Sequence, residues 1–472
     1  MGRGMSTTAT SSVPEWLLSI KGDVGGTPSL ISQPLNDYGN AHRFIAMHGD
    51  RARYCHALNA WLIFGGTHWM IDRIDGARAL AQGVMLEFAR QAMKSGSDTV
   101  AKFAGACLNS QRITAAMREA QPHLAITSDM LDADPWLLPF ENCTVDLRTG
   151  AQRPHRREDF ITKLVRHCYR PDASCERFLA FLRRVVPRLE SYIQKAVGYS
   201  LTGVTFEKAV FICYGGGNNG KTTLLATIKS VLGDDYAVLL QIDTLMVRSE
   251  SNNTQADLAD LRGARFVMTS ETEEGQRLAE GKLKRITQGM GRIKATRKYE
   301  NPIEFNESHK LWLDCNHKPV IRGGDKAIWN RLHLIPFVVT IPDEEIDRDL
   351  SAKLLAEAEG ILAWAVAGAV AWHRDGLGKP ESVQRAGRQW RNDSDQLGRF
   401  IQECCVAGEF AIAKGRTVYT AYRRWGEEAG EKDLATETTF GNTLTDRGYR
   451  KKHTNHGTIY EGIGLRCESQ EP

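Results

Sequence analysis

The sequence lacks an apolar run long enough to cross a membrane. Its most apolar stretch, residues 360–372, is short and rich in alanine, so we expect a buried helix there. The first residues are polar and rich in Ser and Thr without an apolar core, which excludes a secretory signal and predicts a flexible tail over residues 1–30. These absences predict a cytoplasmic protein that has no membrane partner.

Paired cysteines and a strong net charge are also missing. The ten cysteines are scattered without a C-x-x-C pair, which excludes the common zinc spacings and a disulfide framework and fits a reducing compartment. The formal net charge is only +4, so the placement of charge carries more information than its total. No internal repeat or long low-complexity segment occurs, and 472 residues predict two to four domains.

Four of the 43 glycines, in contrast, lie close together in one loop, GGGNNGKTT at residues 215–223. Its spacing fits G-x-x-x-x-G-K-[ST], an apolar run precedes it and a helical pattern follows it, which argues against a turn that matches by chance. Backbone N–H groups of such a loop cradle phosphates, so we expect a nucleoside triphosphate here, with ATP and Mg²⁺ as cofactors. The predicted ATP-binding residues are Gly215, Gly216, Gly217, Asn218, Asn219, Gly220, Lys221, Thr222 and Thr223.

Strand-like runs at 208–214, 264–269, 310–315 and 332–338 alternate with helical patterns, which predicts a mainly parallel, doubly wound sheet. Glu271 follows the second run, where a carboxylate would position Mg²⁺ and the attacking water. Asn316 follows the third run and is able to bond a γ-phosphate, although asparagine is also a common turn residue. Arg331 precedes the fourth run and is either a surface residue or a contact to a neighbouring subunit's site.

Basic residues gather in two segments. Residues 282–298 carry seven Lys or Arg and no acid, and residues 447–453 carry four Lys or Arg. A solvated face is the ordinary explanation for each run taken alone, and nucleic-acid binding is the alternative. Asp132 and Asp134 form a D-x-D pattern that is able to suggest a two-metal centre, but we expect a structural turn because no basic set that would bind a nucleotide is evident nearby.

The order of these motifs resembles superfamily III helicases, and more closely the poxvirus-type primase–helicase family of phages and mobile elements. The resemblance is carried by GGGNNGKTT, MTSETEEG, LWLDCNHKP and DKAIWNRLHLIPF in sequence, and it covers roughly residues 35–467. It implies an α/β fold whose AAA+-like P-loop core has a mainly parallel sheet. The implied domains are an N-terminal helicase-associated α/β domain over residues 31–170, the ATPase over 171–390 and a winged-helix DNA-binding domain over 391–472.

The resemblance also assigns roles residue by residue. Lys221 and Thr222 become the Walker A pair, and Glu271 becomes the Walker B acid that holds Mg²⁺ together with Thr222. Asn316 becomes the sensor of the γ-phosphate, and Arg331 the arginine finger acting in trans. The basic segment becomes a hairpin that grips single-stranded DNA, with a tip at Arg297, Lys298 and Tyr299. The C-terminal domain would contact forked DNA through Arg447, Arg450, Lys451 and Lys452.

Two positions and the length of the N-terminal tail depart from the family pattern. Thr272 follows Glu271 where many members have a second acid, Cys143 stands where glycine is usual, and only a short tail precedes NDYGNA. We therefore expect the helicase part without a primase domain, working with a separate primase or polymerase in a bacterial host cell. The resemblance implies an ATP-dependent DNA helicase of a phage, prophage or plasmid, assembled as a hexameric ring. The alternatives are a replication initiator or loader that binds or melts DNA without processive unwinding, and a P-loop scaffold that remodels proteins.

Overall fold

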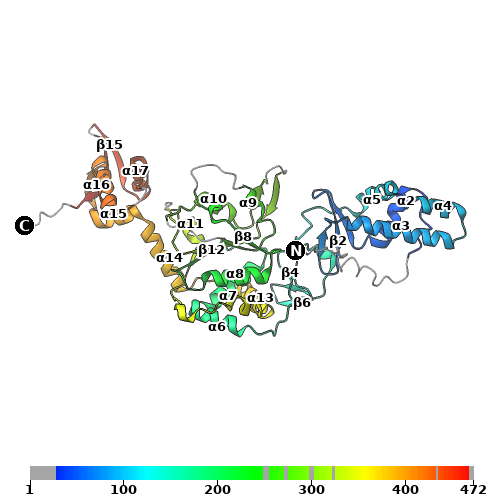
Figure 1. Cartoon of the computed structure of the whole chain (residues 1–472). Helices are drawn as coiled ribbons and strands as arrows, with labels where there is room; N and C mark the ends of the chain where they lie inside the picture. The colour runs from blue at the N-terminus through cyan, green and yellow to red at the C-terminus, as the bar shows by residue number, and fades with distance from the viewer. Residues whose placement is uncertain are drawn as a thin grey trace, which may run out of the picture.

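The computed structural model describes residues 28–247, 255–269, 275–296, 302–321, 325–431, 434–455 and 457–466. These residues form an elongated row of three parts, with the N-terminal helices at one end, the parallel sheet in the middle and the C-terminal unit at the other end (Figure 1). None of the described helices has the length and apolar character that crossing a bilayer requires.

The first part packs helices against a small antiparallel sheet. Its core contains Phe44, Trp61, Val84 and Phe88, and the buried Arg43 guanidinium lies 3.8 Å from the Phe88 ring centroid. Pairing in the sheet follows the order β1-β2-β3. The elements are α2 Asp37–His48, β1 Ala52–Cys55, β2 Ala60–Phe64, β3 Trp69–Ile71, α3 Gly76–Lys94, α4 Asp98–Ala106 and α5 Ser110–Ala120.

A second antiparallel sheet follows, and it shares its core with helices that cover the parallel sheet. Leu138 and Val145 are fully buried in the same cluster as Tyr199 and Trp372. The strands are β4 Leu137–Pro139, β5 Thr144–Asp146 and β6 Ala151–Arg153, and the helices are α6 Glu176–Val185, α7 Glu190–Leu201 and α13 Ala358–Asp375. The apolar stretch 360–372 thus lies in the helix α13, as predicted, and α13 packs along α7.

Asp132 and Asp134 lie in a turn before β4. Asp132 adopts a φ of 52°, and its carboxylate accepts hydrogen bonds from the Thr162 N–H at 2.7 Å and the Thr162 hydroxyl at 2.5 Å. The Asp134 carboxylate accepts from the Trp136 N–H at 2.9 Å. Both carboxylates therefore organise local backbone, which is the structural reading that the sequence favoured.

The central sheet is parallel and has the order β13-β7-β12-β9-β8. Four of its strands confirm the predicted runs, and β8 was not predicted. Phe211 and Cys213 of β7 face one buried cluster, and Val210 and Ile212 face the other, so the sheet is covered on both sides. The strands are β7 Val210–Tyr214, β8 Ala237–Leu240, β9 Phe266–Thr269, β12 Lys310–Cys315 and β13 Leu332–Pro336.

Helices from two groups of connections cover these two faces. One face packs against α7, α8 Lys221–Leu232, α12 Leu350–Leu355 and α13, which supply residues to the first cluster. The other face packs against α9 Gln255–Ala259, α10 Glu280–Ile286, α11 Lys326–Arg331 and α14 Glu381–Ser394. Trp390 of α14 contacts Trp329 of α11 edge to face, with ring centroids 5.3 Å apart. This contact ties α14 to the sheet.

The basic segment 282–298 has two different structures. Its first residues belong to α10, and β10 Arg292–Ala295 then pairs antiparallel with β11 Ile303–Asn306. Gly289 and Met290 have positive φ angles of 79° and 59°, which redirect the chain between the helix and the strand. The hairpin prediction is therefore confirmed for the strands, whereas residues 282–286 are helical.

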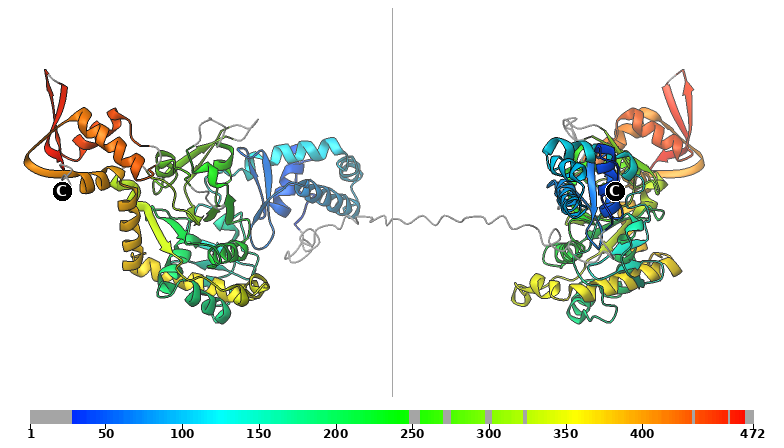
Figure 2. Two further views of the ribbon diagram at one scale, coloured as in Figure 1. Left: turned by 60° about the vertical axis from the view of Figure 1, so that its left-hand side comes forward. Right: turned by 90° about the vertical axis from the view of Figure 1, so that its right-hand side faces the viewer.

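The C-terminal unit has its own core, formed by residues that include Phe400, Val418, Tyr422 and Phe440. The helix α14 leads into it from the central part (Figure 2). Its antiparallel sheet has the order β14-β16-β15. The elements are α15 Gln396–Cys404, β14 Cys405–Lys414, α16 Gly415–Glu428, α17 Glu437–Asp446, β15 Arg450–Thr454 and β16 Gly457–Leu465.

Candidate active site

The carboxyl ends of β7 and β12 meet at one edge of the sheet, because the two strands pair in parallel from Val210↔Leu311 to Tyr214↔Cys315. The glycine-rich loop leaves β7 at this edge, and α8 begins at Lys221. Asn316 directly follows β12. The topology therefore brings two motifs that lie far apart in the sequence to one place, as in other parallel sheets whose sites lie beyond the carboxyl ends of the strands.

Lys221 is the centre of this cluster. Its side chain is buried, and Nζ donates to the Gly215 carbonyl at 2.8 Å, the Asn219 Oδ1 at 3.0 Å and the Asn316 Oδ1 at 2.8 Å. A buried ammonium is costly unless oxygen atoms surround it, and here they come from both the loop and the strand β12. The arrangement holds a positive charge at the mouth of the loop, where it is able to bind an anionic oxygen.

Thr222 and Asp314 form a second contact between the loop and β12. The Thr222 hydroxyl donates to the Asp314 Oδ2 at 2.5 Å, and Asp314 is only 4% exposed. Sequence analysis missed Asp314. The available signal was an acid that interrupts the apolar strand KLWLDC, which is buried at every position. A buried carboxylate in a central strand calls for a partner, and Thr222 is one.

The strand order places one strand, β12, between the strand that precedes the glycine-rich loop and the strand that precedes Glu271. The predicted acid, Glu271, follows β9, but β9 pairs with β12 and not with β7. The strand next to the glycine-rich loop is β12, which carries Asp314 and leads to Asn316. Glu271 itself lies outside the residues that the structure describes.

The loop conformation depends on glycine at two of its positions. Gly220 has a φ of 81°, and a Cβ there would lie 2.7 Å from Val185 Cγ1. A Cβ at Gly215 would lie 2.3 Å from the Phe337 carbonyl oxygen. A Cβ at Gly216 or Gly217, in contrast, would meet no other protein atom within 4 Å, so packing within the chain does not require glycine there.

A segment after β13 fixes the outer side of the loop. The Ile341 N–H donates to the Asn218 carbonyl at 2.7 Å, and the Asn218 amide donates to the Asp343 carboxylate at 3.1 Å. Asn218 has a φ of 53°, which asparagine tolerates better than most residues. Thr223 lies on the first turn of α8 and is half-buried.

The donor set suits phosphate and a single hard cation. The loop supplies backbone N–H groups at the start of α8, Lys221 supplies a positive charge, and Thr222 and Asp314 supply oxygen ligands of the kind Mg²⁺ takes. No group of three or more His, Cys, Asp or Glu side chains with metal-ligating geometry occurs among the described residues. A cation here would therefore need ligands from a bound phosphate as well. Burial raises the pKa of the adjacent Cys213 thiol, and the Asp314 carboxylate raises it further, so the thiol is not a nucleophile.

Arg331 lies away from this cluster. It ends α11, where its guanidinium donates to the carbonyls of Thr287 at 3.3 Å and Ala327 at 2.7 Å. The next residue, Leu332, pairs with Val210 at the start of β7, whereas the loop begins after its end. A five-residue strand separates the two edges by ~16 Å. Arg331 therefore cannot reach the loop of its own chain.

The predicted DNA-binding residues divide into three groups. Arg297, Lys298 and Tyr299 lie outside the described residues, between the paired strands β10 and β11. Arg447 forms an ion pair with Asp395, and Lys452 forms one with Glu461. Arg450 and Lys451 lie exposed on β15, at adjacent positions whose side chains alternate between the two faces of the strand.

Comparisons with known proteins agree with the motif order. Residues 41–187 match the family described as D5 N terminal like, residues 213–331 match a family of unknown function (DUF5906), and residues 392–462 match the family described as Poxvirus D5 protein-like. The apo structure of the NrS-1 C terminal region aligns with a TM-score of 0.50 at 11% identity, covering 90% of this chain and 99% of that one. This likeness concerns the fold.

Three curated viral relatives are similar in sequence. A protein of Acanthamoeba polyphaga mimivirus, named as a proposed helicase, is 27% identical over 63% of this chain and 33% of its own length. A proposed helicase of Invertebrate iridescent virus 3 is 26% identical over 44% of this chain and 23% of its own. A proposed primase of African swine fever virus is 26% identical over 43% of this chain and 22% of its own.

The chain thus spans a third or less of the length of these relatives. The D5-type matches at both ends of the chain and the viral helicase and primase relatives agree with one another. Together, these matches and relatives support the phage- and poxvirus-type primase–helicase family as the family that this chain resembles.

Proposed function

We propose that the chain is an ATP-dependent DNA helicase of a phage, prophage or plasmid replication system, with an AAA+-like core that works as a hexameric ring. The observation that carries this proposal is the contact of Lys221 with Asn316 and of Thr222 with Asp314 at the carboxyl edge of the parallel sheet. The relatives named as proposed helicases and a proposed primase support it.

The residues of the cluster have separate tasks in this proposal. When bound with Mg²⁺, ATP would supply free energy by transfer of its γ-phosphoryl group to water. Lys221 holds the β- and γ-phosphate oxygens, and Asn316 orients the Lys221 ammonium and contacts the γ-phosphate. Thr222 is a ligand of the cation, and Asp314 holds the Thr222 hydroxyl in place. Glu271 is the acid that positions the attacking water. Gly216 and Gly217 leave room for phosphate, since packing does not explain them.

Arg331 acts on the site of a neighbouring subunit. Arg331 lies at the amino edge of the sheet, ~16 Å from the loop of its own chain. It therefore contacts the phosphate that is bound by the loop of a partner subunit. A head-to-tail interface that closes on itself gives a ring. An arginine supplied in this way typically accelerates phosphoryl transfer by about 10³–10⁵-fold.

Two further segments contact DNA in the proposal. The hairpin of β10 and β11 presents Arg297, Lys298 and Tyr299 to a single strand through backbone contacts, as sequence-independent movement requires. In the C-terminal unit, the order helix, strand, two helices and a two-stranded ribbon supports a winged-helix domain over residues 391–472. We also propose domain boundaries at about residues 30, 170 and 390, and a separate primase or polymerase as a partner protein.

The first test measures ATP hydrolysis with and without single-stranded DNA, alongside displacement of a labelled strand from a forked duplex. Lys221→Ala should abolish both activities, and Lys298→Ala should keep basal hydrolysis but lose unwinding. Lys229→Ala, which removes a half-buried lysine of α8 that is paired with Asp234, and Lys353→Ala on α12 are matched controls that should behave as wild type.

The outcomes separate the candidate functions. Hydrolysis without DNA stimulation or strand displacement, but with tight DNA binding, would replace the helicase proposal by the replication initiator or loader. Hydrolysis that ignores DNA altogether would favour a P-loop scaffold that remodels proteins. An unchanged rate in Lys221→Ala would show that the glycine-rich loop is not the catalytic site.

A further inference from the structure

The C-terminal unit contains a concavity of about 1360 Å³ that the helicase motifs do not use. It runs beside α16, whose residues Thr417, Thr420, Arg424 and Glu428 line it at helical spacing. A helix of 14 residues is about 21 Å long. The concavity is therefore an extended groove along a helix, a shape that suits a chain-like ligand.

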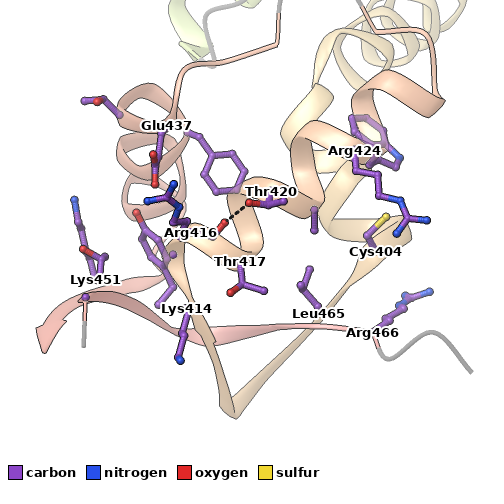
Figure 3. Close-up of a pocket in the computed structure, with 18 of the residues that line it drawn as sticks. Cys404, Lys414, Arg416, Thr417, Thr420, Arg424, Glu437, Lys451, Leu465 and Arg466 are labelled. Carbon is purple, nitrogen blue, oxygen red and sulfur yellow. Dashed lines mark hydrogen bonds between the residues drawn. The ribbon is translucent and has the colours of Figure 1, made fainter. Parts of the chain in front are cut away.

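Basic side chains lie at both ends of this groove. Figure 3 shows Lys414, Arg416 and Lys451 at one end and Arg424 and Arg466 at the other, with Thr417 and Thr420 between them. Among the residues that the structure describes, no ion pair involves Lys414, Arg416 or Lys451. Phosphates of one DNA strand recur every ~3.4 Å along the helix axis, so separated charges over such a length match a backbone.

The acids of the groove do not cancel this charge. Glu403 accepts a hydrogen bond from Trp425 Nε1 at 2.7 Å, and Glu428 accepts one from Arg424 Nε at 2.8 Å. Glu437 lies at the end near Lys451. With five bases and three acids in the lining, the groove keeps an excess of positive charge, concentrated at the Lys414 end.

An exposed aromatic ring lies on the strand that borders the groove. Cys404 and Lys414, which flank and end β14, both line the groove. Between them, pairing with β16 shifts from Ala407↔Ile463 to Ile412↔Glu461, so residues 408–411 bulge outward. Phe410 lies in this bulge with its side chain 92% exposed. A ring without a pocket around it offers a flat stacking surface rather than a protein hot spot.

The helix α17 does not compete for this role. Its span Glu437–Asp446 contains no lysine or arginine and carries acids at both ends. The two faces of β15 also differ, because Lys451 lines the groove, whereas Lys452 is paired with Glu461. Charge in this unit thus favours the groove along α16 over the outer surface of α17.

From these observations we infer that the groove along α16 binds single-stranded nucleic acid. Lys414, Arg416, Lys451 and Arg466 hold the phosphates, and Phe410 stacks on a base. The inference rests on the proposed function in that the bound strand is the one the motor engages, but it assigns the DNA contact of the C-terminal unit to the groove along α16, separate from the central hairpin.

The test is fluorescence anisotropy of a labelled single-stranded oligothymidine with the full chain, without nucleotide and in a Lys298→Ala background. Replacing Lys414, Arg416 and Lys451 together by alanine should weaken binding and reduce the slope of log K against log salt by about 2, at ~0.7 per lost phosphate contact. Phe410→Ala should weaken binding between about fivefold and about a hundredfold. Replacing Arg385, Arg388 and Arg391 of α14, all exposed, removes the same charge elsewhere and should change neither quantity.

Several results would overturn the inference. Equal loss in the α14 triple variant would mean that net charge alone governs binding. Loss in Arg450→Ala without loss in Lys451→Ala would move the contact to the other face of β15. Tighter binding of duplex than of single strand, unaffected by Phe410→Ala, would exclude base stacking, and binding of an acidic peptide instead would identify a protein partner. Since the assay contains no nucleotide, its failure leaves the Lys221 hydrolysis test unaffected.

Discussion

At the scale of single residues, the glycine-rich loop, Lys221 and Asn316 were predictable because each belongs to a local pattern. Asp314 was not, because its significance depends on which strand pairs with β7, and strand order is a property of the tertiary fold. The same holds for the two kinds of glycine in the loop. The sequence predicts that all of them are needed, whereas the structure separates those required by packing from those that packing leaves unexplained.

The Thr222–Asp314 contact predicts a change in magnesium dependence. Asp314→Asn keeps the size of the side chain but weakens its hold on the Thr222 hydroxyl, so the Mg²⁺ concentration for half-maximal ATP hydrolysis should rise ~10–100-fold. A titration of hydrolysis against Mg²⁺ measures it. Asp234→Asn, at an exposed acid paired with Lys229, is the matched control. An Asp314→Asn curve that overlays the wild type would remove Asp314 from the site.

The loop glycines predict opposite effects on stability and activity. Gly220→Ala places a Cβ at positive φ and 2.7 Å from Val185, which should lower the free energy of unfolding by ~1–3 kcal/mol. Gly216→Ala meets no protein atom and should leave the melting temperature unchanged while reducing ATP hydrolysis. Thermal denaturation beside an ATPase assay separates the two. Full activity in Gly216→Ala would show that phosphate does not approach this residue.

At the scale of elements, apolar runs predicted four of the strands and the helix α13. They missed β8, a strand of only four residues in which the first and last are buried and the two between them are not, so no period-2 pattern signals a strand. The resemblance implied a hairpin for the whole basic segment 282–298, and a basic run by itself does not distinguish a helix from a hairpin. The helix α10 forms there because Leu283 and Ile286 pack into the core, a contact that depends on the sheet.

The strand β13 predicts a component of acid sensitivity. Burial lowers the pKa of His333 to about 3, and its Nδ1 shares a 2.6 Å hydrogen bond with the Tyr192 hydroxyl. Because the folded pKa lies below the unfolded value of about 6.5, the unfolded chain binds the proton first, and stability falls as the pH drops below about 6.5. His333→Phe should reduce this slope by up to about 1.4 kcal/mol per pH unit.

Urea unfolding between about pH 7 and about pH 4 measures that slope, and the exposed His453 provides the control substitution. Loss of the hydrogen bond to Tyr192 should lower the free energy of unfolding equally at every pH. The prediction therefore concerns the slope of the free energy of unfolding against pH, and not the urea midpoint at a single pH. An unchanged slope in His333→Phe would assign the acid sensitivity to other groups, such as His48 and His309, whose pKa burial lowers to about 4.

At the scale of the whole molecule, the two edges of the sheet carry different halves of the proposed catalytic site. Lys221 and Arg331 cannot meet within one chain, which predicts complementation between damaged subunits. Lys221→Ala and Arg331→Ala should each be inactive alone. An equal mixture should recover about a quarter of wild-type hydrolysis if sites act independently, because that fraction of interfaces combines an intact loop with an intact arginine.

An ATPase assay on mixed variants measures this recovery, with Lys221→Ala mixed into Asn316→Ala as the control pair. Lys221 and Asn316 belong to the same cluster of one chain, so every site in this mixture contains one damaged residue and no recovery is expected. Recovery to about a quarter would occur only if Asn316 acted on the site of a neighbouring subunit. Absence of recovery in the first mixture, with assembly verified by light scattering, would rule out a trans role for Arg331.

The helix α14 has a mechanical consequence for such a ring. This helix connects the central part to the C-terminal unit, and its Trp390 contacts Trp329, which lies two residues before Arg331. Lys379, just before α14, also donates to the carbonyl of Leu332, the residue after Arg331. In the proposed ring, a load on the C-terminal unit would therefore act on the segment that carries Arg331 through these two contacts. Tension on bound DNA would in this way change the position of Arg331 at the neighbouring subunit's site, so that the rate of hydrolysis would depend on the load on the ring.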